Sequence, residues 1–321
     1  MELVAIVNSY NRLSLMRLGL PSLIQALQSC PFRSAVVIFD AGSNDGSKEW
    51  LKEFFQQNPD ISIDLIFPAS GQDTSFSAGV NRACEYAAKK YPDLKWYFLF
   101  ETDNWIANAE PILKARSLLK TQLRLAAAGF TVTKHSRERA GFGCSFPTVW
   151  QFIMGQQLTH WLKLDRPRIE RWEGFNDMSW TSCDVIYTSP LLVRRSAWEE
   201  SRGLDTVMFP FSDCDIDWAW RVNKLGWKLG VLKTEGVVHD NQQALSAWSD
   251  NRVIHFHRAR LQLLLKHKGV WVKLIKPVLF IRHCLEFFLL LVMYLCLKDP
   301  KKSLKKRQLL IKSVFKNYED I

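Results

Sequence analysis

The sequence predicts an α/β fold with a mostly parallel, twisted sheet flanked by helices. Short, continuous apolar runs alternate with longer segments of helical periodicity over the first two-thirds of the chain. Runs without a polar alternation are typical of strands that are buried on both faces of a parallel sheet. The 321 residues, 47% of them hydrophobic, are enough for one large α/β domain with an appendage or for two modest domains.

The first half of the chain shows a regular order of strands and helices. We expect strands at Leu3–Val7, Ala35–Phe39, Ile61–Phe67 and Trp96–Phe100, and helices at Leu15–Gln28, from Ser47 through Phe55, and at Phe76–Lys90. This order implies parallel strands with right-handed crossovers. Ligands of such sheets bind beyond the carboxyl ends of the strands. Asn8, Asp40 and Glu101 stand at those ends, so one cleft can collect them.

The second half is less regular, and residues 129–180 show no pattern that assigns them to an element. Farther on, we expect strands at Val185–Arg194, Lys228–Leu232 and Gly236–His239, a helix at Asp215–Leu225, and a basic amphipathic helix at Asn251–His267. The composition changes after Gly269. The pattern therefore predicts a domain of residues 1–268 and a helical tail of residues 269–321.

The net charge of +11 is concentrated near the C-terminal end. From Trp271 onward, eleven Lys and Arg residues stand against four acids, a net charge of +7. A basic tail on a nearly balanced domain indicates an anionic membrane surface as the partner, and no nucleic acid. The seven cysteines form no CxxC pair and no zinc spacing, as expected of thiols in a reducing compartment. The N-terminal segment lacks a signal-peptide pattern, so we expect the cytoplasmic face of a membrane.

Residues 278–297 form the longest apolar run. Arg282, His283 and Glu286 fall within about 100° of arc on a helix and make one polar stripe. The uninterrupted part, Phe287–Leu297, would be about 16 Å long, against a hydrocarbon core of about 30 Å. We therefore expect an in-plane amphipathic helix and a peripheral protein in preference to a single span. Basic residues that follow would anchor it to anionic lipid: Lys301, Lys302, Lys305, Lys306 and Arg307. Packing on the preceding domain or on a second subunit is the alternative.

The turn from Asp40 to Ser47 is rich in Gly, Asn, Asp and Ser. Its glycines allow close backbone approach, and Asp40 can accept a hydrogen bond from a nucleobase. A helix-capping loop would have the same composition.

Acidic residues stand next to two predicted elements, after a strand and before a helix. Glu101 and Asp103, spaced i, i+2 after a buried strand, can coordinate a hard divalent cation through oxygen, unless they are incidental acids of a solvated loop. Asp213, Asp215 and Asp217 alternate before an aromatic helix and can supply a general base. Charge favoured by the helix N-terminus explains one or two of these three acids. A lone histidine such as His239 is more often structural, but this one can reach a metal or a phosphate.

Read in order, these segments resemble the GT-A domain of family 2 inverting glycosyltransferases. The N-terminal segments that carry the resemblance are VAIVNSYNR, AVVIFDAGSNDGS, SFSAGVNRACEYA and YFLFETDN. The later segments, DVIYTSPLLVRRSAWEESRGLD, DCDIDWAWRVNKLGW and GVVHD, resemble its rhamnosyltransferase-like branch. The resemblance covers about residues 2–265. It implies a GT-A fold, Rossmann-like, with a nucleotide-sugar donor and a divalent metal, Mn²⁺ or Mg²⁺.

The resemblance also implies roles for single residues. The nucleotide and donor sugar would contact Asn8, Tyr10, Asp40, Ser43, Asp45, Gly79, Asn81 and Asp184. Glu101 and Asp103 match the outer positions of the metal-binding D-x-D motif, and His239 matches a late histidine associated with metal and diphosphate. Asp215 falls on the catalytic aspartate, with Asp217 on the acid that follows.

Three positions depart from the family pattern. Glu101 replaces the first aspartate of the D-x-D motif, and Cys214 replaces the acid before the base, so Asp213 is an alternative base. Thr188-Ser189-Pro190 replaces the usual Gly-Ala and changes the wall of the sugar pocket.

The sequence therefore predicts a metal-dependent inverting glycosyltransferase in cell-surface polysaccharide synthesis. The donor would be a dTDP sugar, with rhamnose favoured, or else a UDP sugar, and the acceptor a saccharide or lipid-linked saccharide. A non-catalytic membrane-surface protein that retains a degenerate transferase fold is the first alternative, and a metal-dependent phosphohydrolase is the second.

Overall fold

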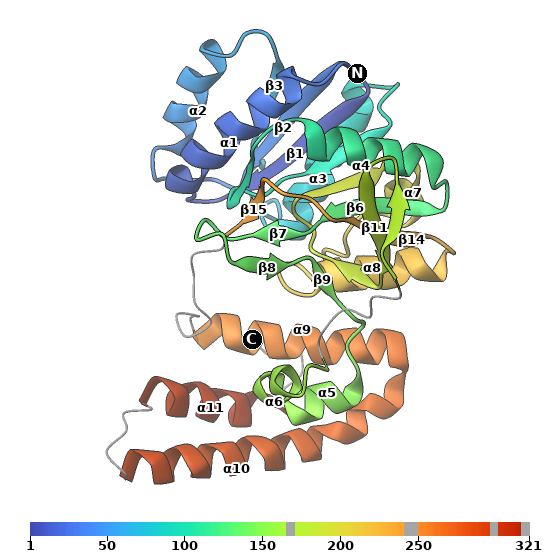
Figure 1. Cartoon of the computed structure of the whole chain (residues 1–321). Coiled ribbons are helices and arrows are strands. Elements are labelled where there is room, and N and C mark those ends of the chain that lie inside the picture. The colour runs from blue at the N-terminus through green and yellow to red at the C-terminus, as the bar shows by residue number, and fades with distance from the viewer. Residues whose placement is uncertain (165–170, 241–249, 296–300, 316–321) are drawn as a thin grey trace. The chain divides into compact units, whose positions relative to one another are not determined.

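The computed structural model describes residues 1–164, 171–240, 250–295 and 301–315. These residues form two compact units: residues 1–146 with 167–241, and residues 147–166 with 242–321. The boundary expected at residue 268 thus lies inside the second unit, which also takes in a segment from the middle of the chain. Figure 1 shows the helices and strands of both units.

A nine-stranded sheet forms the centre of the first unit, in the order β10-β11-β14-β6-β13-β4-β1-β2-β3. Its strands are β1 (Leu3–Ser9), β2 (Ser34–Asp40), β3 (Ser62–Ile66), β4 (Trp96–Leu99), β6 (Leu125–Phe130), β10 (Glu173–Phe175), β11 (Met178–Cys183), β13 (Leu191–Arg194) and β14 (Lys228–Leu232). Seven of the nine run in one direction, and only β11 and β13 are reversed. The expected mostly parallel α/β architecture is confirmed.

Helices cover both faces of this sheet (Figure 1). They are α1 (Leu13–Gln28), α2 (Ser47–Gln56), α3 (Phe76–Lys90), α4 (Glu110–Thr121), α7 (Arg195–Glu200) and α8 (Cys214–Lys224). Alternate residues of β1, Leu3, Ala5 and Val7, pack with α1, α2 and α4 in one core cluster. Helix α3 packs on β1 and β2 from the other face. The sheet is thus buried on both sides, as the unbroken apolar runs predict.

The strand order reverses at β1. Strand β2 and then β3 lie on one side of β1, while β4 lies on the other, and all of these pairs are parallel. Such a switch point leaves a crevice at the carboxyl ends of the two diverging strands. Asn8 near the end of β1, Asp40 at the end of β2 and Glu101 just past β4 are brought to this edge, as expected.

Two small sheets lie beside the large one. The first, in the order β5-β15-β7-β8, contains β5 (Asn104–Ile106), β15 (Val237–His239), β7 (Val132–Thr133) and β8 (Arg139–Gly141), and the second pairs β12 (Val185–Ile186) with β9 (Gly143–Cys144). The pairing of β15 with β5 sets His239 opposite Asn104. The C-terminal end of β15 is thereby placed next to the loop that follows β4.

The single strand expected at Val185–Arg194 is wrong. The structure has β12 and β13 there, in different sheets, joined by residues 187–190. Pro190 has no N–H to donate to a sheet ladder, so a continuous strand is interrupted at this point. The freed segment turns toward the end of β4, where the backbone N–H of Glu101 donates to Ser189 Oγ over 2.5 Å.

The second unit is helical: α5 (Val149–Met154), α6 (Gln156–Trp161), α9 (Asp250–Lys268), the 3-10 helix η2 (Val270–Ile275), α10 (Lys276–Leu295) and α11 (Lys301–Ser313). A core of its own joins Val149, Leu264, Val272, Ile275 and Leu279. Among the described residues, η2 and α10, Val270–Leu295, form one segment long and apolar enough to cross a membrane by length and composition. Of the expected apolar run, residues 296 and 297 lie outside the described part.

Candidate active site

Two loops at the ends of β1 and β2 are joined by hydrogen bonds. The Ala41 N–H donates to the carbonyl oxygen of Ser9 over 2.9 Å. The Asn11 N–H donates to Ser43 Oγ over 2.9 Å, and Asn11 Oδ1 accepts from the Asn44 N–H over 2.8 Å. Ser43, expected to contact a donor, therefore uses its hydroxyl to hold the two loops together.

Asp40 and Asp45 organise the same turn. Asp40 is fully buried, and its Oδ1 accepts the Ser43 N–H over 2.7 Å, while Oδ2 is buried without a partner. Asp45 Oδ2 accepts the Leu13 N–H at the start of α1 over 2.9 Å. Burial opposes the change, but hydrogen bonds from Ser47 and Leu13 hold the pKa of Asp45 below its usual value. Both carboxylates thus shape the loop, and a ligand cannot reach Asp40 in this conformation.

Asn8 and Tyr10 are the accessible groups on this side. Tyr10 is 58% exposed, and Asn8 is half-buried with its Oδ1 unpaired. A Cβ on Gly79 of α3 would lie 2.3 Å from Asn8 Oδ1 and 2.7 Å from Phe39 Cδ1. Gly79 therefore makes room for the Asn8 carboxamide. This steric role explains the glycine without a direct contact between Gly79 and the nucleotide sugar.

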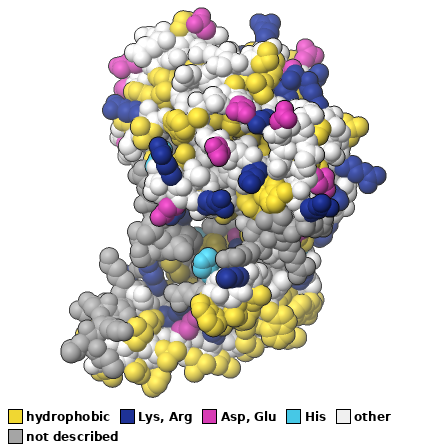
Figure 2. Space-filling model, viewed as in Figure 1, with side chains coloured by type: hydrophobic (Ala, Val, Ile, Leu, Met, Phe, Trp, Pro, Cys, Tyr) yellow, Lys and Arg dark blue, Asp and Glu magenta, His cyan; other side chains and the backbone are white. Residues whose placement is uncertain are grey.

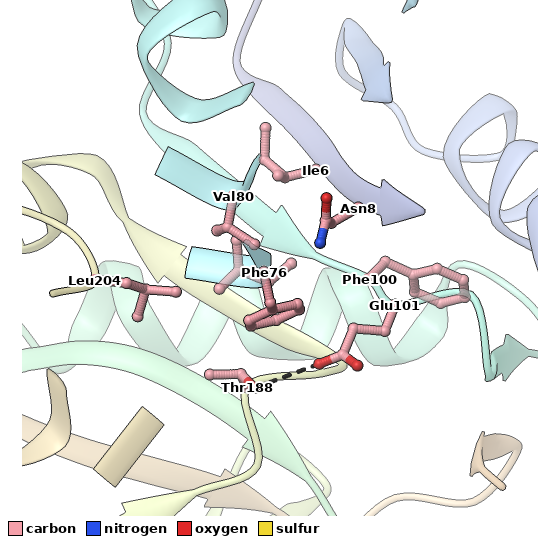
Figure 3. Close-up of a pocket in the computed structure, with 9 residues that line it drawn as sticks. Ile6, Asn8, Phe76, Val80, Phe100, Glu101, Thr188 and Leu204 are labelled. Carbon is pink, nitrogen blue, oxygen red and sulfur yellow. Dashed lines mark hydrogen bonds between the residues drawn. The ribbon is translucent and has the colours of Figure 1, made fainter. Parts of the chain in front are cut away.

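A small pocket lies at the carboxyl ends of β1 and β4. It is lined by Ile6, Asn8, Phe76, Val80, Leu99, Phe100, Glu101, Thr188 and Leu204 (Figure 3). The lining is largely apolar, with the Glu101 carboxyl group directed at Thr188 Oγ1, 3.4 Å away. Asn81 is not among the lining residues. Its side-chain oxygen accepts the Leu204 N–H over 2.9 Å and its amide donates to the Leu204 carbonyl over 2.8 Å, so both ends hold backbone.

Asp103 and His239 face each other across the end of β15. Asp103 Oδ2 lies 4.0 Å from His239 Nε2, and Asp103 Oδ1 is buried without a hydrogen-bond partner. His239 Nδ1 lies 2.6 Å from the carbonyl oxygen of Ser189. A carbonyl oxygen can only accept, so Nδ1 carries a proton, and in the neutral form of the ring Nε2 presents its lone pair. An unpaired carboxylate oxygen and an imidazole nitrogen held in this tautomer fit a divalent cation.

Glu101 joins this pair. Burial raises the pKa of Glu101 to about 7, and the neighbouring carboxylates Asp103 and Asp215 add to the rise, while His239 opposes it. Like charges this close are unfavourable unless a proton or a cation compensates them. Within the described residues, no three His, Cys, Asp or Glu side chains are grouped so that they could hold a metal by themselves. A cation at Asp103 and His239 would therefore take further ligands from a bound molecule.

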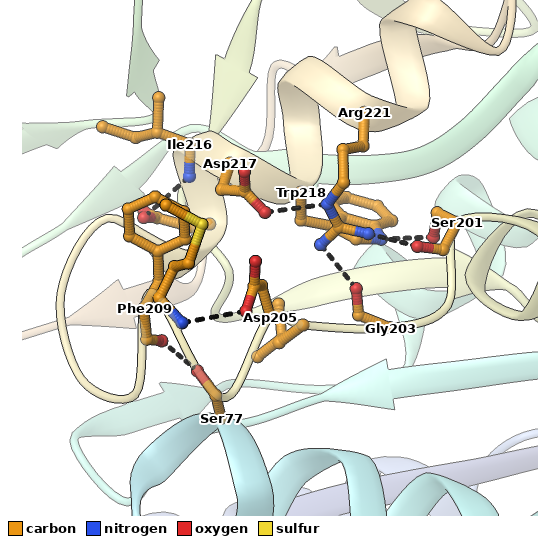
Figure 4. A network of polar contacts seen from close by, with 12 residues as sticks. Ser77, Ser201, Gly203, Asp205, Phe209, Ile216, Asp217, Trp218 and Arg221 are labelled. Carbon is orange, nitrogen blue, oxygen red and sulfur yellow. Dashed lines mark hydrogen bonds and ion pairs between the residues drawn. The ribbon is translucent and has the colours of Figure 1, made fainter. Parts of the chain in front are cut away.

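The three aspartates near the start of α8 have different environments. Asp217 is fully buried and accepts from Arg221 Nε over 2.7 Å (Figure 4). Arg221 in turn donates to the carbonyl oxygens of Ser201 and Gly203. This pairing makes Asp217 a structural residue that fixes α8 to the preceding loop.

Asp213 and Asp215 remain. Asp213 is buried at the N-cap of α8 with a φ of 59°, and its carbonyl oxygen accepts the Asp217 N–H over 2.9 Å. Asp215 is half-buried, and its Oδ1 accepts the N–H of Ile216 over 2.9 Å. Its charge acts on Glu101, which places Asp215 in the same site as Asp103 and His239. Of the three acids, Asp215 is the most accessible one, and its charge helps to raise the pKa of Glu101.

The loop before α8 is fixed by Ser77 at the start of α3. Ser77 Oγ donates to the Phe209 carbonyl over 2.6 Å, and the Ser77 N–H donates to the Pro210 carbonyl over 3.0 Å (Figure 4). Asp184 lies on the opposite side of α8, where its Oδ2 accepts the Phe146 N–H over 3.2 Å. The Phe146 ring stacks on Trp220 of α8 with centroids 4.5 Å apart. Both contacts fix the position of α8 in the unit.

Two residues that contact the candidate site were not identified as such from the sequence. Ser189 is fully buried, and its Oγ accepts from the Glu101 N–H and the Asn104 amide while its carbonyl oxygen orients His239. Thr188 contacts the Glu101 carboxyl group. The sequence did show that positions 188–190 depart from the Gly-Ala of the family pattern. This departure could not show that the segment contacts Glu101, Asn104 and His239.

Comparison with solved structures identifies the fold as GT-A. S. aureus TarS 1–349 with UDP-GlcNAc has a TM-score of 0.51 at 11% identity, over 87% of this chain and 70% of that one. Mannosyltransferase PcManGT from Pyrobaculum calidifontis with GDP-Man and Mn²⁺ has a TM-score of 0.54 at 15% identity, over 100% and 88%. GalNAc-T7 with UDP, GalNAc and Mn²⁺ has a TM-score of 0.57 at 11% identity, over 96% of this chain and 54% of that one. No protein-family model matches the sequence, and no curated protein matches it.

Proposed function

We propose that this protein is a metal-dependent, inverting glycosyltransferase that moves a sugar from a nucleoside diphosphate to a saccharide hydroxyl. The observation that carries the proposal is the convergence of Asp103, His239 and Asp215 at the switch point of a GT-A sheet. The solved neighbours with nucleotide sugars or with Mn²⁺ support it.

Asp103 and His239 are the residues that would hold the cation. When bound, a divalent cation neutralises the charge that develops on a departing diphosphate. The Ser189 carbonyl engages Nδ1 of His239, which leaves Nε2 as the nitrogen for this contact, and β15 holds the ring beside Asp103. The remaining ligand positions suit diphosphate oxygens, because the described residues offer no group of three metal-ligating side chains.

Asp215 acts as the general base in this proposal. It accepts the proton of the acceptor hydroxyl while the hydroxyl oxygen forms a bond to the anomeric carbon and the bond to the diphosphate breaks. Attack from the face opposite the leaving group inverts the anomeric configuration. Asp215 lies in the first turn of α8, and the Ser77 contacts hold the preceding loop in place.

The nucleotide would bind over Asn8 and Tyr10. The exposed Tyr10 ring offers a face for stacking, and the amide nitrogen of Asn8 is directed into the pocket beside Glu101 (Figure 3). The apolar pocket beside Glu101, with Phe76, Val80 and Leu204, suits the methyl group of a 6-deoxyhexose such as rhamnose. A dTDP-linked rhamnosyl donor is therefore our first candidate, a UDP sugar the second, and a saccharide or lipid-linked saccharide the acceptor.

The test is a donor assay. Full-length protein with Mn²⁺ is incubated with dTDP-rhamnose, UDP sugars or GDP-mannose and a mixture of saccharide acceptors, and released nucleoside diphosphate is measured against the Asp215→Asn variant. The anomeric configuration of the product is read by NMR. We expect release from one donor class and an inverted product. Binding of a donor with no turnover on any acceptor or water would favour the non-catalytic alternative.

A further inference from the structure

Exposed apolar side chains are concentrated in the helical unit. Among the described residues, 26 large hydrophobic side chains are exposed, and 19 of them belong to residues 147–164 and 270–315. The rest of the chain, although more than twice as long, holds only seven. Figure 2 shows hydrophobic side chains gathered over α5, α6 and α10. Contiguous patches of this kind mark a surface that meets a partner or a membrane.

Helix α10 ends in five exposed hydrophobic residues, Leu291–Leu295, and carries one continuous apolar stripe along its length. Its members follow a spacing of three or four residues and are between 42% and 75% exposed: Val278, Ile281, Leu285, Phe288, Val292 and Leu295. The 3-10 helix before it extends the surface with Val270, Trp271 and Leu274, each more than half exposed. The spacing puts these residues on one face, which is unpaired within the unit.

The opposite face of α10 is polar and packed inward. Arg282 donates to the carbonyl oxygens of Phe152 and Ile153 at the end of α5, over 2.6 and 2.9 Å. His283 Nε2 lies 3.0 Å from His257 Nε2 of α9, and Glu286 lies 2.5 Å from Arg307 of α11. The polar stripe expected from the sequence thus has protein partners on three helices.

These contacts oppose a transmembrane position for α10. With 20 residues it is about 30 Å long and could span by length alone. Glu286 stands near its middle, however, and draws Arg307 and the basic helix α11 alongside. A span would bring Lys305 and Lys312, both exposed on α11, toward the hydrocarbon core, which is unfavourable for charged side chains.

Helices α5 and α6 add a second apolar segment to the same unit. Trp150 and Trp161 are 73% and 75% exposed, and Leu158, Leu162 and Leu164 are also exposed. Val149 anchors this hairpin in the core shared with α9, η2 and α10, and Arg282 holds the end of α5. Tryptophan with leucine on an exposed helical surface is typical of contact with the lipid headgroup region.

We propose that the helical unit docks on an anionic bilayer surface through two segments distant in the sequence, η2–α10 and α5–α6, with α10 lying in the plane of the membrane. The charge supports this occupant, because the segment from Trp271 onward has a net charge of +7. The cytoplasmic leaflet carries such anionic lipid. The insertion at residues 147–164, to which the sequence assigned no role, is a lipid-contacting element in this proposal.

Flotation of the full-length protein on vesicles tests the proposal. Vesicles of phosphatidylcholine alone are compared with vesicles that contain phosphatidylglycerol at low and high salt. We expect strong binding to the anionic vesicles, weakened by salt. The double charge reversal Lys305→Glu with Lys312→Glu should weaken binding by about fivefold or more per residue. Equal binding to both vesicle types would contradict the anionic partner. A lipid-free dimer that binds no vesicle would show that a second copy covers the surface instead.

The insertion is tested by the double variant Trp150→Ser with Trp161→Ser. Both side chains are exposed, so the unit should fold, as circular dichroism would verify. We expect at least a tenfold loss of vesicle binding, of the order known for loss of interfacial apolar area. The matched control is Leu123→Ser with Val207→Ser, which are 71% and 80% exposed in the first unit. Equal loss in both pairs, or none in either, would remove α5–α6 from the lipid surface. Donor binding should be unchanged in both double variants, so a loss of vesicle binding can be separated from a failure of the proposed activity.

The orientation of α10 is tested by labelling. Lys268→Cys and Ser303→Cys place thiols at exposed positions before η2 and after α10, and vesicle-bound protein is treated with a membrane-impermeant maleimide. Peptide mass spectrometry then distinguishes the new thiols from the natural ones. An in-plane helix predicts labelling at both positions from the outside. Labelling at only one position until detergent is added would show that α10 spans the bilayer and would overturn the proposed arrangement.

Discussion

The imidazole of His239 is oriented by the backbone of Ser189, whose carbonyl oxygen lies 2.6 Å from Nδ1. This contact fixes the proton on Nδ1 and turns Nε2 toward Asp103, 4.0 Å away. Hydrogen bonds of this kind orient metal-ligating histidines and tune their affinity. In the proposed cation site, the segment at 188–190 thus orients one ligand toward another that is more than a hundred positions away in the sequence.

Replacing Asp215 by Asn should abolish transfer and leave donor binding intact. Loss of a general base costs about 10² to 10⁴ in rate, and the amide keeps the shape of the side chain. Turnover and donor affinity are measured on the same preparation. Asp213→Asn is the matched control, since Asn tolerates the left-handed backbone at that position. If Asp213→Asn were inactive and Asp215→Asn active, the base would be Asp213.

Replacing Asp217 by Asn should destabilise the fold. Arg221 would lose the carboxylate that it contacts at 2.7 Å, and breaking a buried ion pair from one side costs about 3 kcal/mol or more. Urea denaturation of the variant gives the free energy of unfolding. Asp177→Asn, at an exposed position, is the control and should have little effect. If the variant were as stable as the wild type, Asp217 would not have the structural role that distinguishes it from Asp213 and Asp215.

Replacing Gly79 by Ala should weaken nucleotide binding by displacing Asn8. The added Cβ would lie 2.3 Å from Asn8 Oδ1 and 2.7 Å from the Phe39 ring, so one of these must move. We expect at least a tenfold loss of donor affinity, equivalent to about one hydrogen bond to the ligand. Gly174→Ala, where a Cβ meets nothing within 4 Å, is the control. Unchanged affinity in Gly79→Ala would remove Asn8 from the nucleotide site.

The helical unit should lose stability in mild acid. Its buried histidines His257 and His283 lie 3.0 Å apart, and burial lowers the pKa of both. Four further charged groups act on this pair: Arg258, Arg282, Arg307 and Glu286. The arginines and the neighbouring histidine lower the pKa of His257 further, while Glu286 opposes the lowering at His283.

The direction of this pH dependence follows from proton linkage. Because the folded pKa values lie below the ordinary value of about 6.5, the unfolded state binds more protons. Stability is therefore complete above about pH 6.5 and falls as the pH drops below it. Hydrogen exchange in α9 and α10 at pH 5 and pH 7.5 measures this. His257→Phe removes one titrating group and should reduce the difference, whereas an undiminished difference would place the effect elsewhere.

The sequence predicted the edge of the sheet well, because buried parallel strands leave an unbroken apolar run and their polar end residues must meet. The family resemblance also predicted that the Glu101–Asp103 loop and the start of α8 belong to one site, which stays a prediction. It could not separate ligand contacts from local backbone contacts. Asp40 and Asn81 are polar residues at matching positions, yet their side chains bind the backbone of Ser43 and Leu204.

The parts of the fold that the sequence did not predict depend on contacts between residues far apart in the chain. Periodicity at Val185–Arg194 resembled one strand, but Ser189 binds the backbone of Glu101 and Pro190 interrupts the ladder. Likewise, residues 147–164 have no recognisable pattern of their own. Their place follows from Arg282 and from Val149 in a core built by the C-terminal helices, and such contacts leave no local signal.

Calorimetric titration of nucleotide sugars into wild-type protein and the His239→Asn variant, with Mn²⁺ or with a chelator, tests the central claim most directly. The Asn amide can still donate to the Ser189 carbonyl, so the fold should be kept while the metal ligand is lost. We predict that one dTDP- or UDP-sugar binds the wild type with Mn²⁺ at least tenfold more tightly than with chelator, within the 10- to 100-fold range typical of disturbed metal sites. The variant should bind equally weakly under both conditions. Full Mn²⁺-dependent affinity in the variant, or no binding of any nucleotide sugar to the wild type, would contradict the account.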